Sequence, residues 1–233
     1  MVTQPRLIAM TEAERTIALA GAPEEVARLL LEAAEAGHDE AQLLVGQIHL
    51  DGQGVPRNAG EALRWFGLAA KSGNAMAMNM VGRCCEHGWG TIVDKKLAGQ
   101  WYASAADRGG LDWAMYNLAT LYTLGEGVNE DRTEALRLFE QAAALGHAKS
   151  INMIGSFYED GWVVERNLAT AALHYQKAAE LGDFRGQFNH ARMLVAAADM
   201  EGARYWFTRM TQTATPAFRE KATAWMAEHA PAT

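Results

Sequence analysis

Apolar residues recur through most of the chain at steps of three and four positions. That spacing gathers side chains on one face of a helix, and no segment keeps the period of two that marks a half-buried strand. The helical pattern begins clearly at Glu24 and returns in a final stretch after Thr215 and Pro216. The sequence therefore predicts an all-α fold with no sheet.

The helical stretches belong to repeats, and each repeat closes on a glycine. These glycines lie 36 or 37 residues apart, at Gly37, Gly73, Gly109, Gly146 and Gly182. Early in each repeat an apolar residue precedes a small one, as in Val45-Gly46, Val81-Gly82, Leu118-Ala119 and Ile154-Gly155. Later in each repeat come two large residues, namely Trp65-Phe66, Trp101-Tyr102, Leu138-Phe139 and His174-Tyr175. Four matching copies are too many for coincidence, and they indicate a repeat fold.

A glycine-rich turn separates the two halves of each repeat. The four turns read Gly52-Gln53-Gly54, Gly88-Trp89-Gly90, Gly125-Glu126-Gly127 and Gly161-Trp162-Val163. Glycine supplies the positive φ that ends the first helix, and the closing glycine ends the second. Each repeat is thus predicted to be an antiparallel helix pair. Because one pair cannot bury its apolar face alone, neighbouring pairs should stack.

This pattern resembles the Sel1-like repeat (SLR) family, a branch of the tetratricopeptide superfamily. The resemblance covers roughly Val26 to Gly182, with a degenerate continuation to about Met210. It implies a right-handed α-solenoid of TPR-like helix pairs that acts as a protein-interaction scaffold. The sequence departs from the family where His49 and Cys85 take its tyrosine position, and where Val163 replaces the second turn glycine.

We expect the repeats to form a single domain over residues 1–233. It would comprise an N-terminal half-repeat or cap at 11–37, four repeats at 38–182, a degenerate repeat at 183–210 and a capping helix at 215–229. Thr11 and Glu14 read as a capping box, Pro23 lies near the first turn of a helix, and residues up to about Met10 are expected to be loosely held. The last helix would cover the exposed end with Phe218, Ala222, Trp225 and Met226; alternatively, that apolar side would form a homodimer.

Composition narrows the class of protein. The chain has 233 residues, 49% of them hydrophobic, and a formal net charge of −7. That apolar content excludes a disordered chain, and the acidic balance argues against nucleic acid as a partner. No apolar run reaches transmembrane length, and the first 21 residues have no continuous apolar core. We therefore expect a cytoplasmic protein without a secretory signal peptide.

Signatures of catalysis are missing from the sequence. It contains no phosphate-binding glycine loop, no H-E-x-x-H pair and no G-x-S-x-G elbow, so we expect no catalytic residues and no cofactor. Cys84 and His87 share a helical face and have side chains that suit zinc, but two ligands do not make a site. Cys84 and Cys85 are instead expected to be buried and reduced, and no metal is expected.

Several positions have a structural interpretation. The small residues Gly46, Gly82, Ala119, Gly155 and Ala191 share one position and indicate that the facing helix comes too close for a side chain. The pairs Trp65-Phe66, Trp101-Tyr102 and Trp206-Phe207 are predicted to be core. Two turn residues, Trp89 and Trp162, are interpreted either as plugs folded back onto the protein or as partner contacts.

The tetratricopeptide arrangement implies that the first helix of each pair lines a concave groove. The groove residues would be Asn79, Met80, Arg83, Tyr116, Asn117, Thr120, Asn152, Met153, Ser156, Phe188, Asn189 and Arg192. Four successive repeats thus carry one asparagine each, and an exposed amide can both donate to and accept from a peptide backbone. Alternatively, each asparagine bonds to a neighbouring helix and only solvates the inner face.

The predicted partner is a peptide, tail or helix of another protein. Arg83, Arg185 and Arg192 favour a ligand with an acidic segment or a free carboxylate. We expect the free protein to be a monomer, without nucleic-acid or membrane partners. The alternative is a structural protein that self-associates through its C-terminal helix.

Overall fold

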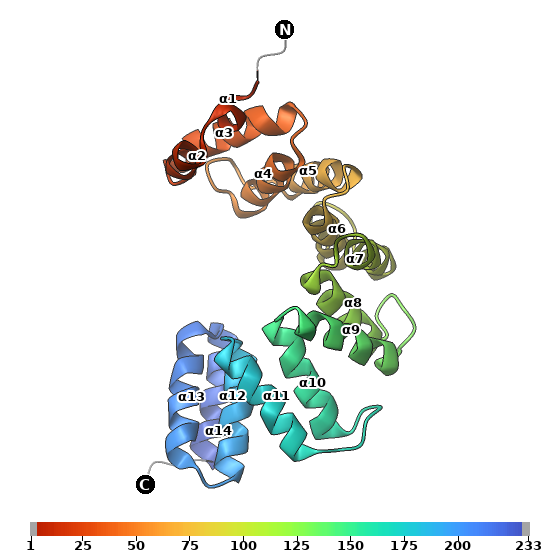
Figure 1. Cartoon of the computed structure of the whole chain (residues 1–233), viewed down its shortest axis with the longest axis vertical. Helices are drawn as coiled ribbons and strands as arrows, with labels where there is room; N and C mark the ends of the chain where they lie inside the picture. The colour runs from red at the N-terminus through yellow and green to blue at the C-terminus, as the bar shows by residue number, and fades with distance from the viewer. Residues whose placement is uncertain (1–3, 230–233) are drawn as a thin grey trace. The chain divides into compact units, whose positions relative to one another are not determined.

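The computed structural model describes residues 4–229, and this range consists of helices and the turns between them (Figure 1). The all-α prediction is confirmed. The chain divides into two compact units, one up to Glu130 and the other from Asp131 onward, so that the boundary falls inside the third repeat. None of the described helices is long and apolar enough to cross a bilayer.

The first compact unit contains three N-terminal helices followed by five helices of the repeats. They are α1 (Arg6–Ala9), α2 (Glu12–Leu19), α3 (Pro23–Glu35), α4 (Asp39–Asp51), α5 (Ala59–Lys71), α6 (Ala75–His87), α7 (Lys95–Gly109) and α8 (Asp112–Leu124). Each helix from α3 to α7 packs against the next one along the chain, as the stacked-pair prediction requires.

The second compact unit repeats this arrangement. Its helices are α9 (Arg132–Ala144), α10 (Ala148–Asp160), α11 (Leu168–Glu180), α12 (Phe184–Ala196), α13 (Met200–Thr213) and α14 (Pro216–His229). Helices α10 and α11 form one pair, and α12 and α13 form the degenerate pair that follows (Figure 1).

Side-chain caps fix where the second helix of each repeat begins. The capping residues are Asn58, Asp94, Asp131 and Asn167, and each side-chain oxygen accepts a hydrogen bond from the backbone N–H three residues later. A cap of this kind contributes about 1 kcal/mol to helix stability. The predicted capping box of Thr11 and Glu14 and the predicted Pro23 in the first turn of α3 are both confirmed.

Glycines end the first helices as predicted, because Gly52, Gly88, Gly125 and Gly161 all have positive φ values between 67° and 75°. Helix α7, the second helix of its repeat, ends one residue later than predicted. It continues through Gly109, and Gly110 adopts the left-handed conformation with φ 58°. With Gly110 as the closing glycine, the interval of 37 residues runs from Gly73 to Gly110 and contains this longer helix.

The glycine at the small position of three first helices lies against an aromatic ring. A Cβ atom on Gly46, Gly82 or Gly155 would lie 2.5–2.6 Å from the ring of Phe66, Tyr102 or Tyr175, respectively. A side chain there would require the helix pair to separate. The predicted close approach is therefore confirmed, with the ring as the contacting group.

Only part of the predicted aromatic core is fully buried. In the four repeats at 38–182 the second of the two large residues is inaccessible, as for Phe66 and Tyr102. Trp65 is buried as well, but Trp101, Trp206 and Phe207 are only half-buried. The prediction that these three rings belong to the core was therefore too strong, and in the degenerate pair it fails for both members.

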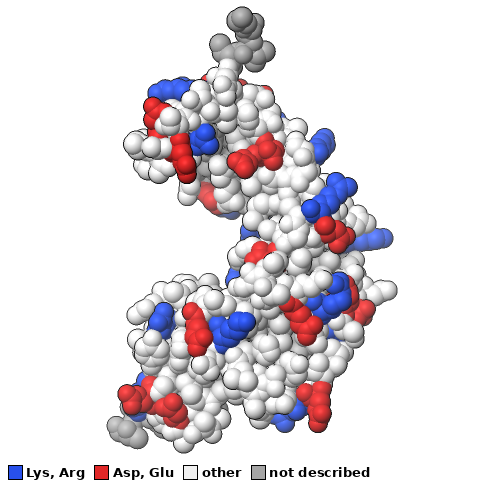
Figure 2. All heavy atoms as spheres, in the orientation of Figure 1, with Lys and Arg blue, Asp and Glu red and all other residues white. Residues whose placement is uncertain are grey.

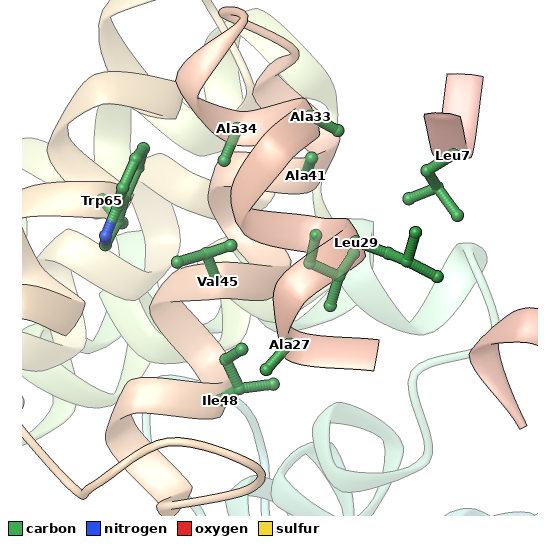
Figure 3. Packing of buried hydrophobic residues seen from close by; sticks show 10 residues of the cluster. Leu7, Ala27, Leu29, Ala33, Ala34, Ala41, Val45, Ile48 and Trp65 are labelled. Atoms are coloured by element: carbon green, nitrogen blue, oxygen red, sulfur yellow. The ribbon is translucent and has the colours of Figure 1, made fainter. Parts of the chain in front are cut away.

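The N-terminal end has its own apolar cluster, which joins α1, α3, α4 and α5 (Figure 3). Leu7 of α1 is buried against α3, in a cluster that includes Leu29 and Val45. The backbone N–H of Arg6 also donates to a carboxylate oxygen of Glu32 at 2.9 Å. The expectation of a loosely held start was therefore wrong for α1, because burial of Leu7 fixes this helix.

Candidate functional site

The predicted groove residues lie on the first helices of the repeats. In the first compact unit, α6 carries Asn79, Met80 and Arg83, and α8 carries Tyr116, Asn117 and Thr120. In the second, α10 carries Asn152, Met153 and Ser156, and α12 carries Phe188, Asn189 and Arg192. We call these sets the first-helix faces of the two units, and each is described by itself.

The four asparagines form two matching pairs. The Nδ2 of Asn117 donates to the Oδ1 of Asn79 at 2.9 Å, and the Nδ2 of Asn189 donates to the Oδ1 of Asn152 at 2.9 Å. Asn79 is 3% exposed and Asn152 is 4% exposed, whereas their partners are half-buried. The expectation that all four asparagines are exposed was therefore wrong. The structure agrees with the alternative, because each asparagine bonds to an asparagine of a neighbouring first helix.

The alternation of the asparagines explains the pairing. Asn79 stands three positions before its small residue Gly82, whereas Asn117 stands two positions before Ala119. This offset turns the two amides toward each other across adjacent first helices. The pair leaves the Oδ1 of Asn117 without a hydrogen bond from the described residues, whereas the Oδ1 of Asn189 accepts from the guanidinium of Arg192 at 3.1 and 3.3 Å.

An ion pair completes the first-helix face of the second unit. The guanidinium of Arg192 donates to both oxygens of Glu159, at 3.0 and 3.2 Å, and the hydroxyl of Tyr175 donates to Glu159 at 2.6 Å. Burial raises the pKa of Glu159, but the hydrogen bonds from Arg192 and Tyr175 outweigh it, so the pKa lies below its usual value. The hydroxyl of the predicted groove residue Ser156 lies 3.2 Å from that of Tyr175, to which it can donate.

The first unit has the same tyrosine and carboxylate but a different third residue. The hydroxyl of Tyr102 donates to Glu86 at 2.5 Å, and burial together with this bond raises the pKa of Tyr102. The position equivalent to Arg192 holds Thr120, whose hydroxyl donates to the backbone carbonyl of Tyr116 at 2.9 Å. Among the described residues, no cation lies within ion-pair distance of Glu86.

Arg83 is held by an aromatic ring. Its guanidinium lies 4.9 Å from the ring centroid of Trp89 and contacts the sulfur of Met80 at 3.8 Å. The charge of Arg192 is paired with Glu159, and Arg185 lies over the rings of Phe184 and Phe218. Of the three arginines expected to attract an acidic ligand, Arg192 is therefore already neutralised within its unit.

The C-terminal helix covers part of the predicted site. The ring of Phe188 lies 5.6 Å from that of Phe218 and 5.5 Å from that of Trp225, both edge-on. Ala222 and Met226 of the same helix are buried. Phe188 therefore packs against its own chain, and so does the apolar side of α14 that was considered for a homodimer.

The two turn tryptophans fold back onto their own units. Trp162 packs edge-on against Phe157 at 5.4 Å, with Arg132 4.6 Å above its ring. Trp89 lies 4.9 Å from His87 and beneath Arg83. Both rings are half-buried, as the plug interpretation predicts.

The cysteines are buried and carry free thiols, as expected. Burial, with a smaller contribution from Cys85, raises the pKa of Cys84 to about 11. His87 is exposed at the end of α6. Among residues 4–229, no group of three histidine, cysteine or acidic side chains is arranged to hold a metal ion.

The sequence interpretation missed the carboxylates of Glu86 and Glu159. Each follows the small glycine of its helix by four positions, and each occurs in a repeat whose buried ring is tyrosine. The repeats with phenylalanine rings have Leu50 and Thr123 at that position. Glutamate at this position thus occurs only in the repeats with a tyrosine ring. That correlation could have predicted the tyrosine–glutamate pairs from the sequence.

Charge alone does not mark out a binding surface. Lysine and arginine side chains are interspersed with aspartate and glutamate over the visible face of both units (Figure 2). The candidate site therefore depends on individual side chains of the first-helix faces.

Comparison with known proteins agrees with this architecture. The pattern of the family described as Sel1 repeat matches residues 39–74, 75–110, 114–147 and 148–183. A solved Sel1 repeat protein from Oxalobacter formigenes superposes with a TM-score of 0.83 at 24% identity, over 93% of this chain and 88% of that one.

Two curated relatives are described as regulators. The chitin synthase regulator SKT5 of Saccharomyces cerevisiae is 31% identical over 160 residues, which make up 65% of this chain and 23% of SKT5. An exopolysaccharide production negative regulator of Rhizobium leguminosarum bv. viciae is 27% identical over 177 residues, covering 70% of this chain and 66% of the relative. The chain thus spans less than two thirds of the length of either protein.

Proposed function

The chain belongs to the Sel1 repeat family, whose members generally mediate protein–protein interactions, and we propose that it is a non-catalytic scaffold that binds a peptide, tail or helix of a partner protein. The proposal places the contact on the first-helix faces. The regulators among the relatives are consistent with a protein that acts by binding another protein.

The observation that carries the proposal is the incomplete hydrogen bonding of the Asn79–Asn117 pair. The amide oxygen of Asn117 accepts no bond from the described residues, although its amide nitrogen is held by Asn79. A fixed amide with a free acceptor suits the backbone N–H of an extended peptide. Because the hydrogen bond to Asn79 already holds the Asn117 side chain in place, little side-chain conformational entropy is lost when the ligand binds.

The residues around that amide provide the other contacts. Tyr116 and Thr120 are half-buried on α8, and Arg83 is half-buried on α6. Aromatic and arginine side chains are the usual anchors of protein interfaces. Among the described residues Arg83 has no acidic partner, so an acidic or carboxylate group of the ligand would lie opposite it.

The second unit contributes a more closed surface. The oxygen of Asn189 is occupied by Arg192, and Phe188 is covered by Phe218 and Trp225. Of the predicted groove residues on α10, Met153 and Ser156 are half-buried, and Ser156 is within hydrogen-bond distance of Tyr175. The first-helix face of the first unit is therefore the stronger candidate.

Self-association through the C-terminal helix has less support. A homodimer through Trp225 would have to displace its contact with Phe188. We expect the free chain to elute as a monomer in size-exclusion chromatography with light-scattering detection. A stable dimer would favour the structural alternative.

The test uses an immobilised library of random acetylated dodecapeptides. We expect wild-type protein to bind a subset of them, and the double variant Tyr116→Ala, Thr120→Ala to lose at least tenfold in affinity, because interface aromatics dominate binding energy. The matched control is Gln100→Ala on the exposed side of α7, which should bind as wild type. Unchanged binding by a folded double variant would contradict the proposed surface.

A further inference from the structure

We propose that the Glu86 carboxylate is a binding site for a basic side chain of the partner, an arginine or lysine that occupies the place Arg192 takes beside Glu159. The inference rests on the proposed function and deepens it. Its basis is that the two compact units contain the same local construction, once complete and once with the cation missing.

The complete construction is found in the second unit. Glu159 receives the hydroxyl of Tyr175 at 2.6 Å and two bonds from the guanidinium of Arg192 at 3.0 and 3.2 Å. Arg192 comes from the first helix of the following repeat. The carboxylate at this position therefore has room for a tyrosine hydroxyl and a forked guanidinium together, in the two-bond geometry that favours arginine.

The construction in the first unit has the same glycine, tyrosine and carboxylate. Glu86 follows Gly82 by four positions, as Glu159 follows Gly155, and Tyr102 donates to Glu86 as Tyr175 donates to Glu159. The ring of each tyrosine lies against the corresponding glycine. The two carboxylates thus share these partners on their own helix pairs, and the constructions differ one position after the glycine, where the first unit has Arg83 and the second has Ser156.

The cation of the following repeat is absent in the first unit. The position of Arg192 is one residue after the small residue Ala191, and the equivalent residue after Ala119 is Thr120. Its hydroxyl is turned to the carbonyl of Tyr116 and its side chain is too short to replace a guanidinium. Glu86 therefore keeps an unused acceptor capacity, because one hydroxyl donor occupies only one of its lone pairs.

The nearby arginine does not fill the gap. Arg83 precedes Glu86 by three positions, a spacing at which side chains on a helix can meet. Its guanidinium instead lies over Trp89, at 4.9 Å from the ring centroid. Trp89 thus keeps Arg83 apart from Glu86 and leaves one positive and one negative group for the ligand.

The position is partly exposed to solvent. Glu86 and Thr120 are both half-buried, and Asn117 with its free amide oxygen belongs to the same face of the first unit. A peptide that bonds to Asn117 could therefore place a basic side chain toward Glu86. The favoured ligand class is a peptide with an arginine or lysine, and a nearby acidic group would suit Arg83.

The first experiment places an arginine of the protein itself beside Glu86. Thr120→Arg copies the Arg192–Glu159 pair, so it should raise the melting temperature, and this gain should vanish in the Glu86→Gln background. The matched control Gln100→Arg adds the same charge on exposed α7 and should leave the melting temperature unchanged. A Thr120→Arg protein that melts no higher than the Gln100→Arg protein would overturn the proposed geometry.

The second experiment measures recognition with the immobilised dodecapeptide library, followed by single peptides in which the selected arginine is replaced by citrulline. We expect wild type to select arginine or lysine at a fixed position, and citrulline to weaken binding about three- to tenfold, the range for a partly desolvated ion pair. Glu86→Gln should reduce the affinity similarly and abolish the citrulline effect. Thr120→Arg should block the site, whereas the exposed control Asp107→Asn should bind as wild type.

The outcomes separate this inference from the proposed function. Peptides that bind the first-helix face without any preference for a basic residue would overturn the role of Glu86 and leave the scaffold function intact. If the basic preference were unchanged in a folded Glu86→Gln protein, the inference would equally fail. Loss of binding in the Tyr116→Ala, Thr120→Ala variant is the separate measure of the scaffold function.

Discussion

The side-chain amide of Asn117 donates a hydrogen bond to Asn79 at 2.9 Å and thereby joins the first helices of two successive repeats. The same bond recurs between Asn189 and Asn152. Asn79 and Asn152 are buried, so each bond satisfies polar atoms that would otherwise lose their contact with water. The asparagines therefore have a structural role before any role in binding.

The first prediction follows from this burial. Asn117→Ala leaves the Oδ1 of Asn79 without its donor, so it should lower the free energy of unfolding by about 1–3 kcal/mol. Urea denaturation followed by circular dichroism would measure the change. The control Asn129→Ala, at an exposed turn position, should shift the free energy little. Equal midpoints for the two variants would contradict the role of the bond.

The second prediction concerns the close contact of Gly82 with Tyr102. Gly82→Leu should destabilise the protein by at least about 1–3 kcal/mol, because a Cβ alone would lie 2.6 Å from the ring. The matched control is Gly67→Ala in helix α5, where a Cβ would meet nothing within 4 Å. That change should be neutral or stabilise by up to about 1 kcal/mol, since alanine favours a helix. Thermal melts of both proteins would show whether the two glycines differ in this way.

Much of the fold could be predicted because the repeat presents each structural constraint several times. The small position, the turn glycines and the paired helices recur at fixed spacing, and the structure contains them where the spacing places them. A single occurrence of Gly46 would have been ambiguous, whereas the set that includes Gly82 and Gly155 was not.

The candidate site could be predicted less well, because its side chains are determined by contacts between repeats. The sequence placed the asparagines on the correct helices, but the offset that turns Asn79 toward Asn117 becomes meaningful only when two first helices are adjacent. Similarly, nothing in the spacing shows that α14 returns to cover Phe188 with Phe218. Periodicity defines a face of one helix and leaves open what covers that face.

A third prediction comes from the turn that lost its second glycine. Val163 has φ 51°, a left-handed conformation that is unfavourable for a β-branched residue. Val163→Gly should remove strain worth about 1–2 kcal/mol per residue, offset in part by the greater freedom of glycine in the unfolded chain. We therefore expect a small rise in the melting temperature by calorimetry. The neighbouring change Val164→Gly relieves no such strain and should lower it; a fall with both variants would contradict the strain argument.

A fourth prediction concerns thiol chemistry. A pKa of about 11 for Cys84 leaves about one thiolate in a thousand at pH 8, and the side chain is buried. Cys84 in the Cys85→Ala protein should therefore react with an aromatic disulfide reagent far more slowly when folded than in urea. The rate is followed by absorbance of the released thiolate. Comparable rates in the two states would mean that the thiol is accessible.

The last prediction is a pH dependence that arises from Glu159. The hydrogen bonds from Arg192 and Tyr175 lower the pKa of this carboxyl in the folded protein, so the folded state binds the proton less readily than the unfolded state does. The resulting stabilisation is present above the ordinary value of 4.5 and is lost as the pH falls through the lowered folded-state pKa. Wild type and Arg192→Leu should therefore differ in melting temperature at pH 6, and the difference should shrink as the pH is lowered toward 3. Arg209→Leu, whose guanidinium lies over the rings of Tyr205 and Trp206, is the control, since its effect has no reason to follow the titration of Glu159. If the Arg192→Leu difference stayed constant from pH 6 to pH 3, the ion pair would not be the source of the stabilisation.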